Sequence, residues 1–301
     1  MAFKSRTESL ELRILRILNT RMELSEECRK NYSYLEKGYA GEVQFDLLTE
    51  ELESTCLILN DLLLEINGTK FQIDTLIIFQ ETIYQFEVKN YEGDYCYDEE
   101  SFQTFSGQER KNPFDQLKRS KSLLRQLNQT IGYNLPIEGY VVFINPEFAL
   151  FQTPKNLPII FPGQLNRFMK KLNKKQTKLN SWHTKLAERL VSLHIVESPY
   201  GRLPPYEYDK IKKGGNCKKC SSFALSVHGK KLICNDCGCE ESIESAVLRS
   251  VNEIKLLFPD RKITTKEVHE WCQVVESKKR IARILERNFK IKGFGQWAFY
   301  E

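Results

Sequence analysis

The sequence predicts an α/β fold in which a larger domain of strands and helices is followed by two smaller modules. Strand-like and helical patterns alternate between residues 37 and 197, and two closely spaced pairs of cysteines follow. Three further helical patterns fill the C-terminal part of the chain. We therefore expect five parts: an N-terminal helical arm (1–36), the α/β domain (37–197), a linker (198–216), a cysteine-rich module (217–240) and a mostly helical module (241–301).

The composition is typical of a globular, cytoplasmic protein. A chain of 301 residues with 41% hydrophobic content can bury at least one core, and its length suggests two or three domains. The N-terminal residues alternate charge with leucine, unlike a signal peptide, and no stretch reaches the roughly 18 apolar residues of a membrane span. In a reducing cytosol, nine cysteines favour metal binding or burial over disulfides. Because the net charge is only +5, any nucleic-acid contact should depend on a local basic patch.

The first helix of the α/β domain is expected in "KGYAGEVQFDLLTEEL", after a helical pattern in the N-terminal arm. Its apolar residues Val43, Leu47 and Leu48 share one face, while Glu42 and Asp46, four residues apart, share another. The segment therefore predicts an amphipathic helix with an acidic flank.

Three consecutive strands are expected next, because the apolar pattern changes to a two-residue period. Asn67-Gly68 is a strong signal for the first hairpin turn, and we place the second turn at Gln80-Glu81. The strands should end near Gly93.

A second helix and further elements complete this domain. The helix follows Pro113, is expected to bury Phe114, Leu117 and Leu124, and ends near Gly132. "IEGYVVFINP" predicts a buried strand, "LPIIFP" a short one, and "QLNRFMKKLN" and "SWHTKLAERLVSL" predict helices. The linker that follows is rich in Pro, Gly, Tyr and Lys.

Three charged residues interrupt segments that otherwise have the pattern of buried strands. With Gln80-Glu81 as the turn, Asp74 lies directly across from Glu87, and side-chain alternation places Glu87 and Lys89 on one face. Facing carboxylates repel unless a cation neutralises them, and Mg²⁺ is commonly held by one or two carboxylates plus a substrate phosphate. Lys89 could then neutralise developing phosphate charge or orient a water. The alternative is structural: Asp74 caps a strand end, while Glu87 and Lys89 form a solvated pair at the sheet edge.

Four motifs in order, "GEVQF", "QID", "FEVKNYEG" and "NPFDQLKRS", make residues 37 to 165 resemble the nuclease-related domain (NERD) family of the PD-(D/E)xK phosphodiesterase superfamily. The resemblance implies a restriction-endonuclease-like αβ core with a central mixed sheet. It also implies Asp74 and Glu87 as ligands of Mg²⁺ or Mn²⁺, Lys89 as the catalytic lysine, and Glu42 and Gln116 as accessory catalytic residues on helices.

The pattern departs from the superfamily name at one position, where Ile73 replaces the proline before the aspartate. Glu42 could instead be a solvated helix residue, and Gln116 a polar residue in the first turn after Pro113. Four basic residues on or beside the same helix suit either a phosphate backbone or a solvated face. They are Lys111, Lys118, Arg119 and Arg125.

The cysteine pairs predict a zinc ribbon. Two C-x2-C knuckles separated by thirteen residues can present four thiolates to one tetrahedral ion, which leaves no open position, so the Zn²⁺ would be structural. The predicted ligands are Cys217, Cys220, Cys234 and Cys237. Cys239 and His228 are competing ligands, and four buried free thiols are the structural alternative.

The C-terminal module predicts a helix-turn-helix with a short wing, from helices at 242–257, 264–275 and 277–289 and a terminal strand in "GQWAFYE". Thr264 with Glu267 fits a capping box, and Ser277 caps the third helix. Residues 277 to 292 contain seven basic residues against one acid, which suits DNA binding or, alternatively, a solvated face. The basic residues are Lys278, Lys279, Arg280, Arg283, Arg287, Lys290 and Lys292.

Together these features predict a metal-dependent nuclease, a hydrolase of DNA phosphodiester bonds, with settings in repair, plasmid maintenance or defence against foreign DNA. DNA is the expected partner. The sequence leaves open a homo-oligomer or protein partner, the strand preference, and the choice between DNA and RNA. One alternative is a non-catalytic nucleic-acid-binding protein that retains the nuclease fold as a scaffold. Another is an assembly factor whose C-terminal modules contact proteins.

Overall fold

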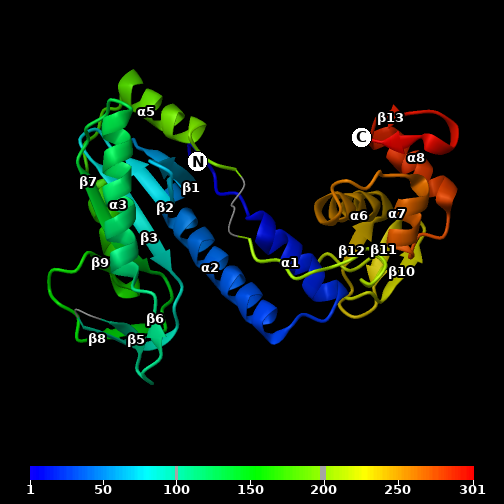
Figure 1. The fold of residues 1–301 in the computed structure, drawn as a ribbon, viewed down its shortest axis with the longest axis horizontal. Helices are drawn as coiled ribbons and strands as arrows, with labels where there is room; N and C mark the ends of the chain where they lie inside the picture. Colours follow the sequence, from blue (N-terminus) through cyan, green and yellow to red (C-terminus); the bar gives the residue numbers. More distant parts are fainter. Residues whose placement is uncertain (99–100, 197–200) are drawn as a thin grey trace. The chain divides into compact units, whose positions relative to one another are not determined.

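The computed structural model describes residues 1–98, 101–196 and 201–301, which form two compact units (Figure 1). Unit 1 contains Met1–Leu10 and Ser33–Gly201, and unit 2 contains Glu11–Tyr32 and Arg202–Glu301. In these ranges, no helix is both long and apolar enough to cross a membrane.

The N-terminal segment is divided between the two units. In unit 1, Lys4 forms a parallel bridge with Leu59, whereas Ile14 and Leu18 of helix α1 (Leu10–Arg21) belong to the hydrophobic core of unit 2. Leu10, the first residue of this helix, is half exposed. The five-part division expected from the sequence stays a prediction, and the first residues of its linker, 198–200, lie outside the described residues.

A five-stranded mixed sheet forms the centre of unit 1, in the order β1-β2-β3-β7-β9. The first three strands are antiparallel neighbours, while β3, β7 and β9 run parallel. The central mixed sheet expected from the sequence is therefore confirmed. The strands are β1 (Leu57–Ile66), β2 (Thr69–Ile78), β3 (Ile83–Lys89), β7 (Ile137–Phe143) and β9 (Ile159–Ile160).

Both predicted hairpin turns are present. Asn67 and Gly68 have φ angles of 50° and 71°, as a two-residue primed turn requires. Between β2 and β3 the turn lies at Gln80-Glu81, and Ile78 pairs with Ile83. The register assumed for the second hairpin is therefore confirmed, although its turn residues are not the favoured ones.

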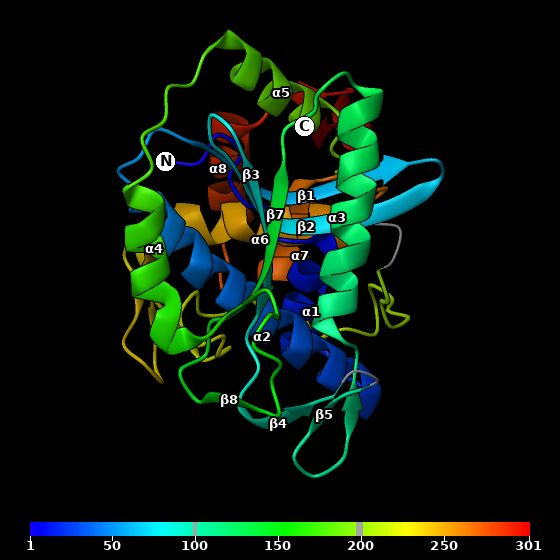
Figure 2. The same ribbon diagram turned by 90° about the vertical axis from the view of Figure 1, so that its left-hand side faces the viewer.

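Helices cover both faces of this sheet. On one face, α2 (Glu26–Glu50) and α4 (Leu165–Asn173), which follows a short turn at Pro162–Gln164, pack against β3 in one hydrophobic cluster. On the other face, α3 (Pro113–Thr130) and α5 (Ser181–Ser192) pack against β1 and β2. Figure 2 shows α3 and α4 on opposite sides of β7.

The buried face of α2 differs from the expected one. The helix buries Gly41, Phe45 and Thr49, whereas Leu47 is 60% exposed. Phe45 packs on Phe86 of β3 with ring centroids 5.1 Å apart, so the large aromatic side chain determines which face turns inward. The α3 prediction, by contrast, is confirmed at all three apolar positions.

A second, four-stranded sheet in unit 1 was not predicted. It has the order β6-β5-β4-β8, and its strands have only two to five residues, too few to show a clear period. Aromatic packing stabilises it, including Phe143 stacked on Phe148 at 3.8 Å. The strands are β4 (Gly93–Tyr97), β5 (Phe102–Thr104), β6 (Glu109–Arg110) and β8 (Phe148–Phe151).

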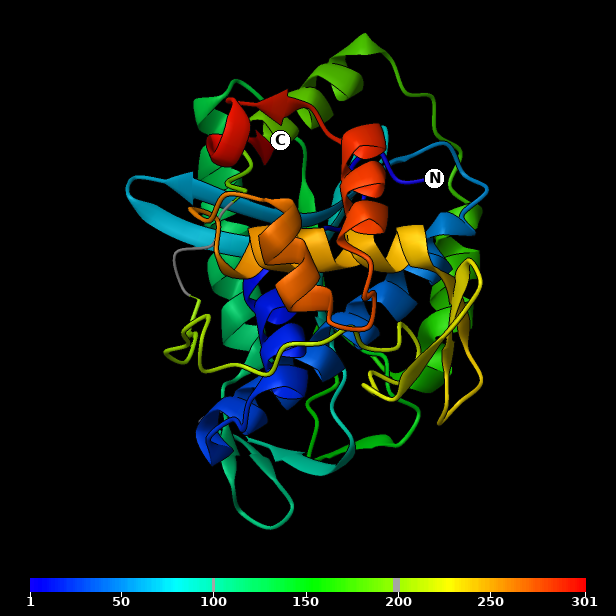
Figure 3. The same ribbon diagram turned by 90° about the vertical axis from the view of Figure 1, so that its right-hand side faces the viewer.

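Unit 2 combines a small antiparallel sheet with a winged-helix arrangement. The sheet contains β10 (Leu225–His228), β11 (Lys231–Cys234) and β12 (Glu240–Ser242). Three helices follow, seen in gold, orange and red-orange in Figure 3: α6 (Ile243–Leu257), α7 (Thr265–Cys272) and α8 (Lys278–Asn288).

The wing after α8 is a hairpin of β13 (Ile291–Lys292) and β14 (Phe299–Tyr300), with a 3₁₀ turn at Gly295–Trp297. Ile263, between α6 and α7, pairs with Tyr300 and adds a third strand position. Helix, strand, two helices and a wing follow one another, so the predicted winged-helix-like module has the expected element order.

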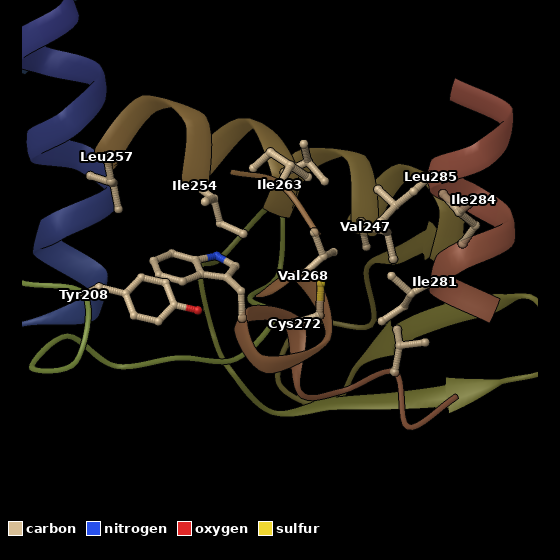
Figure 4. Close-up of a cluster of buried hydrophobic side chains, with 14 of the residues drawn as sticks. Tyr208, Val247, Ile254, Leu257, Ile263, Val268, Cys272, Ile281, Ile284 and Leu285 are labelled. Carbon is tan, nitrogen blue, oxygen red and sulfur yellow. The ribbon is translucent and has the colours of Figure 1, made fainter. Parts of the chain in front are cut away.

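The core of the winged-helix module is apolar and contains contributions from all three helices, as Figure 4 shows. Trp271 is fully buried in it. Thr264 and Ser277 cap α7 and α8 as predicted. The carboxylate of Glu267, however, bonds with Arg261 rather than completing a capping box.

Candidate functional site

The acidic residues singled out by the sequence lie where β2 and β3 separate. The β2–β3 ladder ends at Thr75 and Phe86, after which β3 continues alongside β7. Asp74 is therefore one residue beyond the last pair. Its Oδ2 accepts a hydrogen bond from the Val88 backbone amide at 2.8 Å, so the carboxylate points across to β3 beside Glu87.

Glu87 and Lys89 form a buried pair in the middle of the sheet. Lys89 Nζ donates to Glu87 Oε1 at 2.7 Å and to Gln116 Oε1 at 3.4 Å. Glu87 is 1% exposed, and β3 lies between β2 and β7. The structural alternative of a solvated pair at a sheet edge is therefore wrong.

Gln116 reaches the pair because of how α3 begins. Asn112 caps the helix by accepting from the Phe114 amide at 2.9 Å, and Pro113 occupies the first turn. Gln116 follows in that first turn. The charge of exposed Lys111 acts to lower the pKa of Glu87.

Glu42 is held on α2 by an arginine that the sequence did not single out. Arg6 Nη1 donates to Glu42 Oε2 at 2.6 Å, and its Nε and Nη2 donate to Asp46 at 2.8 and 2.9 Å. Nη2 also donates to the Asp74 backbone carbonyl at 2.8 Å. The Arg6 side chain is 4% exposed. A single buried cation thus ties α2 to β2 at the acidic site.

Asp61 is a further acid that the sequence did not indicate. It lies opposite Asp74, between the paired positions Asn60 and Leu62 of β1, and has a positive φ of 54°. Its charge acts to raise the pKa of Asp74 and of Glu42. Lys4 Nζ donates to its backbone carbonyl at 2.7 Å. The only signal in the sequence is an acid within an apolar run.

Burial raises the pKa of Glu42, Asp74 and Glu87. Desolvation, followed by repulsion from Asp74, raises the pKa of Glu42 to about 8 and that of Glu87 to about 7. Desolvation also raises the pKa of Asp74. Burial acts to lower the pKa of Lys89, but attraction to Glu87 and Asp74 outweighs it, so that pKa is raised. The metal-free site is therefore short of positive charge.

The site offers hard oxygen ligands from two strands. Among the described residues, the carboxylates of Glu42, Asp74 and Glu87 do not form a convergent cluster of three metal ligands. Two carboxylates, however, are enough for Mg²⁺ when waters and a phosphate complete the shell. The donors present at Asp74 and Glu87 therefore fit Mg²⁺ or Mn²⁺.

The four predicted cysteines of unit 2 converge. Their Sγ atoms all lie within 4.8 Å of one another, with Cys217 to Cys237 at 3.6 Å and Cys220 to Cys234 at 3.5 Å. Four sulfurs about 2.3 Å from a tetrahedral centre are about 3.8 Å apart, so the cluster fits Zn²⁺. Cys239, whose Sγ contacts the Glu240 carbonyl, is not part of it.

The basic residues of α8 lie on its outer face. Ile281, Ile284 and Leu285 are buried on the opposite face. Arg287 Nη1 lies 3.9 Å from Glu244 Oε2. The predicted binding residues are exposed except for the half-buried Arg280, and they are Lys278, Lys279, Arg280, Arg283 and Arg287.

Comparison with known families agrees with the geometry of unit 1. Residues 37–144 match the family model of the nuclease-related domain, NERD. The match begins within α2 and ends just after β7, so it contains all five residues of the acidic site that the sequence predicted. The chain therefore carries a nuclease-related domain. Neither the curated proteins nor the solved structures yielded a match.

Proposed function

We propose that the protein is a Mg²⁺- or Mn²⁺-dependent nuclease that hydrolyses DNA phosphodiester bonds in the cytoplasm. Unit 1 would be catalytic, and unit 2 would bind DNA. The observation that carries this proposal is the burial of Asp74 and Glu87 beside Lys89, within a nuclease-related domain. Acids with raised pKa values around a lysine destabilise a metal-free fold and are frequent at catalytic sites.

Asp74 and Glu87 would hold the metal ion. Among the hydrogen bonds of the described residues, Asp74 uses Oδ2 for the Val88 amide and Glu87 uses Oε1 for Lys89. Oδ1 of Asp74 and Oε2 of Glu87 are left for an ion. When bound, such an ion polarises the phosphate and lowers the pKa of a water ligand.

Lys89 would stabilise negative charge that develops on the phosphate. Its ammonium is held between Glu87 and Gln116, so the charge is positioned before the substrate arrives. Gln116 would act as a positioning residue through Lys89. Glu42, whose pKa is raised to about 8, would exchange a proton with the attacking water near neutral pH.

Unit 2 would supply affinity for DNA. The exposed basic face of α8 suits the phosphate backbone, because lysine and arginine contacts to phosphates position a protein on a duplex without selecting sequence. The four-cysteine cluster would bind a structural Zn²⁺ that fixes the ribbon next to α6 along the chain.

The test is to incubate the purified full chain with plasmid, single-stranded DNA and RNA, with Mg²⁺, with Mn²⁺ and with chelator. We expect cleavage of at least one DNA substrate that requires a divalent ion. Binding of DNA without cleavage under every condition would contradict the nuclease and support the scaffold alternative.

One observation favours that alternative, in which the nuclease fold binds nucleic acid without cutting it. Lys89 already neutralises Glu87 at 2.7 Å, as a purely structural ion pair would. In that case Lys89→Met paired with Glu87→Leu should leave function intact, because apolar residues can replace a buried ion pair. In a nuclease, the same double variant should lose cleavage.

A further inference from the structure

The wing of unit 2 exposes two aromatic rings at its tip. Phe294 is 92% exposed and Trp297 is 74% exposed, and both lie in the turn between β13 and β14. Large aromatic side chains are usually buried on folding or at an interface, because their apolar surface is costly to hydrate. Two of them on one short turn indicate a contact surface.

The backbone of the turn holds these rings outward in a defined loop. Gly293 and Gly295 have φ angles of 80° and 59°, which favour glycine. The Trp297 amide donates to the Phe294 carbonyl at 3.2 Å, and a Cβ at Gly293 would lie 2.8 Å from the Trp297 carbonyl oxygen. The tip is therefore a compact, hydrogen-bonded turn.

Most charged residues around the wing are basic, although Glu301 pairs with Lys292 at 2.6 Å. α8 leads directly into β13, and the segment from Lys278 to Lys292 contains seven basic residues and one acid. Positive charge interleaved with exposed aromatic rings is typical of surfaces that bind single-stranded nucleic acid, where the backbone contacts cations and bases stack on rings. A partner with negative charge and flat apolar faces fits this surface better than an acidic protein does.

We propose that Phe294 and Trp297 stack on unpaired bases of a DNA whose phosphates are bound by α8. Bases inside a duplex already stack on their neighbours, so only unpaired or terminal bases have a free face. The preferred substrate class is therefore DNA with a single-stranded tail or an opened end beside duplex. This inference rests on the proposed DNA binding by unit 2.

The test measures binding of the full chain, in chelator so that no cleavage occurs, to two probes by fluorescence anisotropy. One probe is a duplex with a short unpaired thymine tail. The other has the same duplex with a tail of abasic sites, which keeps the phosphates and removes the bases. We expect tighter binding to the thymine tail, and a roughly tenfold or greater loss of that binding alone in a Phe294→Leu, Trp297→Leu variant.

Two control variants separate stacking from other contacts. Trp297→Phe keeps an aromatic face and should retain most of the preference for bases. Ile291→Ala removes an apolar side chain, 55% exposed, from the same wing and should leave the preference unchanged. Because Trp271 is buried in the core and remains in every variant, its near-ultraviolet circular dichroism verifies that each one is folded.

Equal affinity of the wild type for the two tails would overturn the inference, as would an equal loss on both probes in the leucine variant. The latter result would assign the wing to duplex or protein contact. Binding of neither probe would contradict DNA binding by unit 2 itself. Metal-dependent plasmid cleavage by the leucine variant, measured separately, tests the nuclease independently of the wing.

Discussion

The acidic site of unit 1 is buried, whereas the basic face of α8 in unit 2 is exposed. Glu87 is 1% exposed and bonded to Lys89, while Lys279 and Arg283 point into solvent. A buried charge loses hydration and must be neutralised by partners or by a shifted pKa, whereas an exposed one costs little. Cleavage at the buried acidic site should therefore depend on individual residues. DNA binding at the exposed face of α8 should depend on the summed charge of several basic residues.

We expect the largest effect from loss of zinc at the four-cysteine cluster of unit 2. We expect about one Zn²⁺ per chain, and its removal should unfold the ribbon, because structural zinc contributes on the order of 10 kcal/mol to such modules. Cys220→Ser should abolish stoichiometric zinc, whereas Cys239→Ser, outside the cluster, should retain it. Elemental analysis measures both. Less than half an equivalent in the wild type, with no iron in its place, would contradict the ribbon.

The buried site should be intolerant of single changes. Asp74→Ala and Glu87→Ala should each slow metal-dependent cleavage by roughly a thousandfold or more, since a bound metal contributes several kcal/mol to the transition state. Lys89→Ala should cost about a hundred- to a thousandfold. Glu65→Ala, an exposed acid on β1, is the matched control and should cut normally. Wild-type rates in an Asp74→Ala, Glu87→Ala double variant would end the catalytic assignment.

Arg6 is a buried cation in unit 1. Arg6→Ala should destabilise the protein by about 3–5 kcal/mol, because two half-buried acids, Glu42 and Asp46, would lose a buried partner. Denaturant unfolding measures the change. Arg189→Ala, an exposed arginine on α5, should change stability by less than about 0.5 kcal/mol. An equally small change for Arg6 would show that it is not needed for the fold.

Substitutions on the exposed basic face of α8 should weaken DNA binding in small, additive steps. Replacing Lys279, Arg283 and Arg287 with Ala should weaken DNA binding at every sequence and reduce the slope of log affinity against log salt by about 3, because each lost phosphate contact retains roughly one counterion. Cleavage at saturating DNA should survive, since remote binding mainly lowers the substrate concentration required.

A charge-matched control uses three exposed lysines at the end of α4, two in the helix and one at its C-cap. Lys170, Lys171 and Lys174 replaced with Ala remove the same charge from unit 1. If both triple variants give the same salt slope, the effect reflects net charge and not a binding face. The protein-contact alternative for unit 2 would then be favoured.

The smallest effect concerns pH. Glu87 has an ordinary pKa of 4.5 that burial raises to about 7 in the folded state, so its contribution to stability is present below about pH 4.5 and lost as the pH rises to about 7. In chelator, Glu87→Gln should therefore have a larger free energy of unfolding than the wild type, and the difference should grow to on the order of 1–3 kcal/mol as the pH rises from 5 to 8. A difference independent of pH would indicate that Glu87 is already ionised at pH 5.

Local patterns predicted much of this molecule. The Gln80-Glu81 turn and the strand period were enough for the register of the β2–β3 hairpin, whose last pair, Thr75 and Phe86, is next to Asp74 and Glu87. The cysteine spacing was enough for the four-sulfur cluster, because knuckles and hairpins are short-range structures. The capping residues of α7 and α8 were also identified from sequence alone.

Long-range packing was not predictable in the same way. Phe45 faces inward because Phe86 lies beneath it in the fold, although the two are distant in sequence. Arg6 reaches Glu42 and Asp74 only because Lys4 pairs with β1, and neither residue belongs to a motif. Such contacts join residues that are distant in sequence, so they depend on the tertiary structure and not on a local pattern.

A fragment that begins at residue 37, where the family match begins, would keep Glu42, Asp74, Glu87, Lys89 and Gln116. It would lose the guanidinium that neutralises two acids of α2 and grips the main chain of β2. Truncation of the protein at the boundary of the family match would therefore remove the arginine that holds the acidic site in place. If such a fragment were inactive, the cause would be the loss of Arg6 from the N-terminal segment, and not an absence of nuclease chemistry.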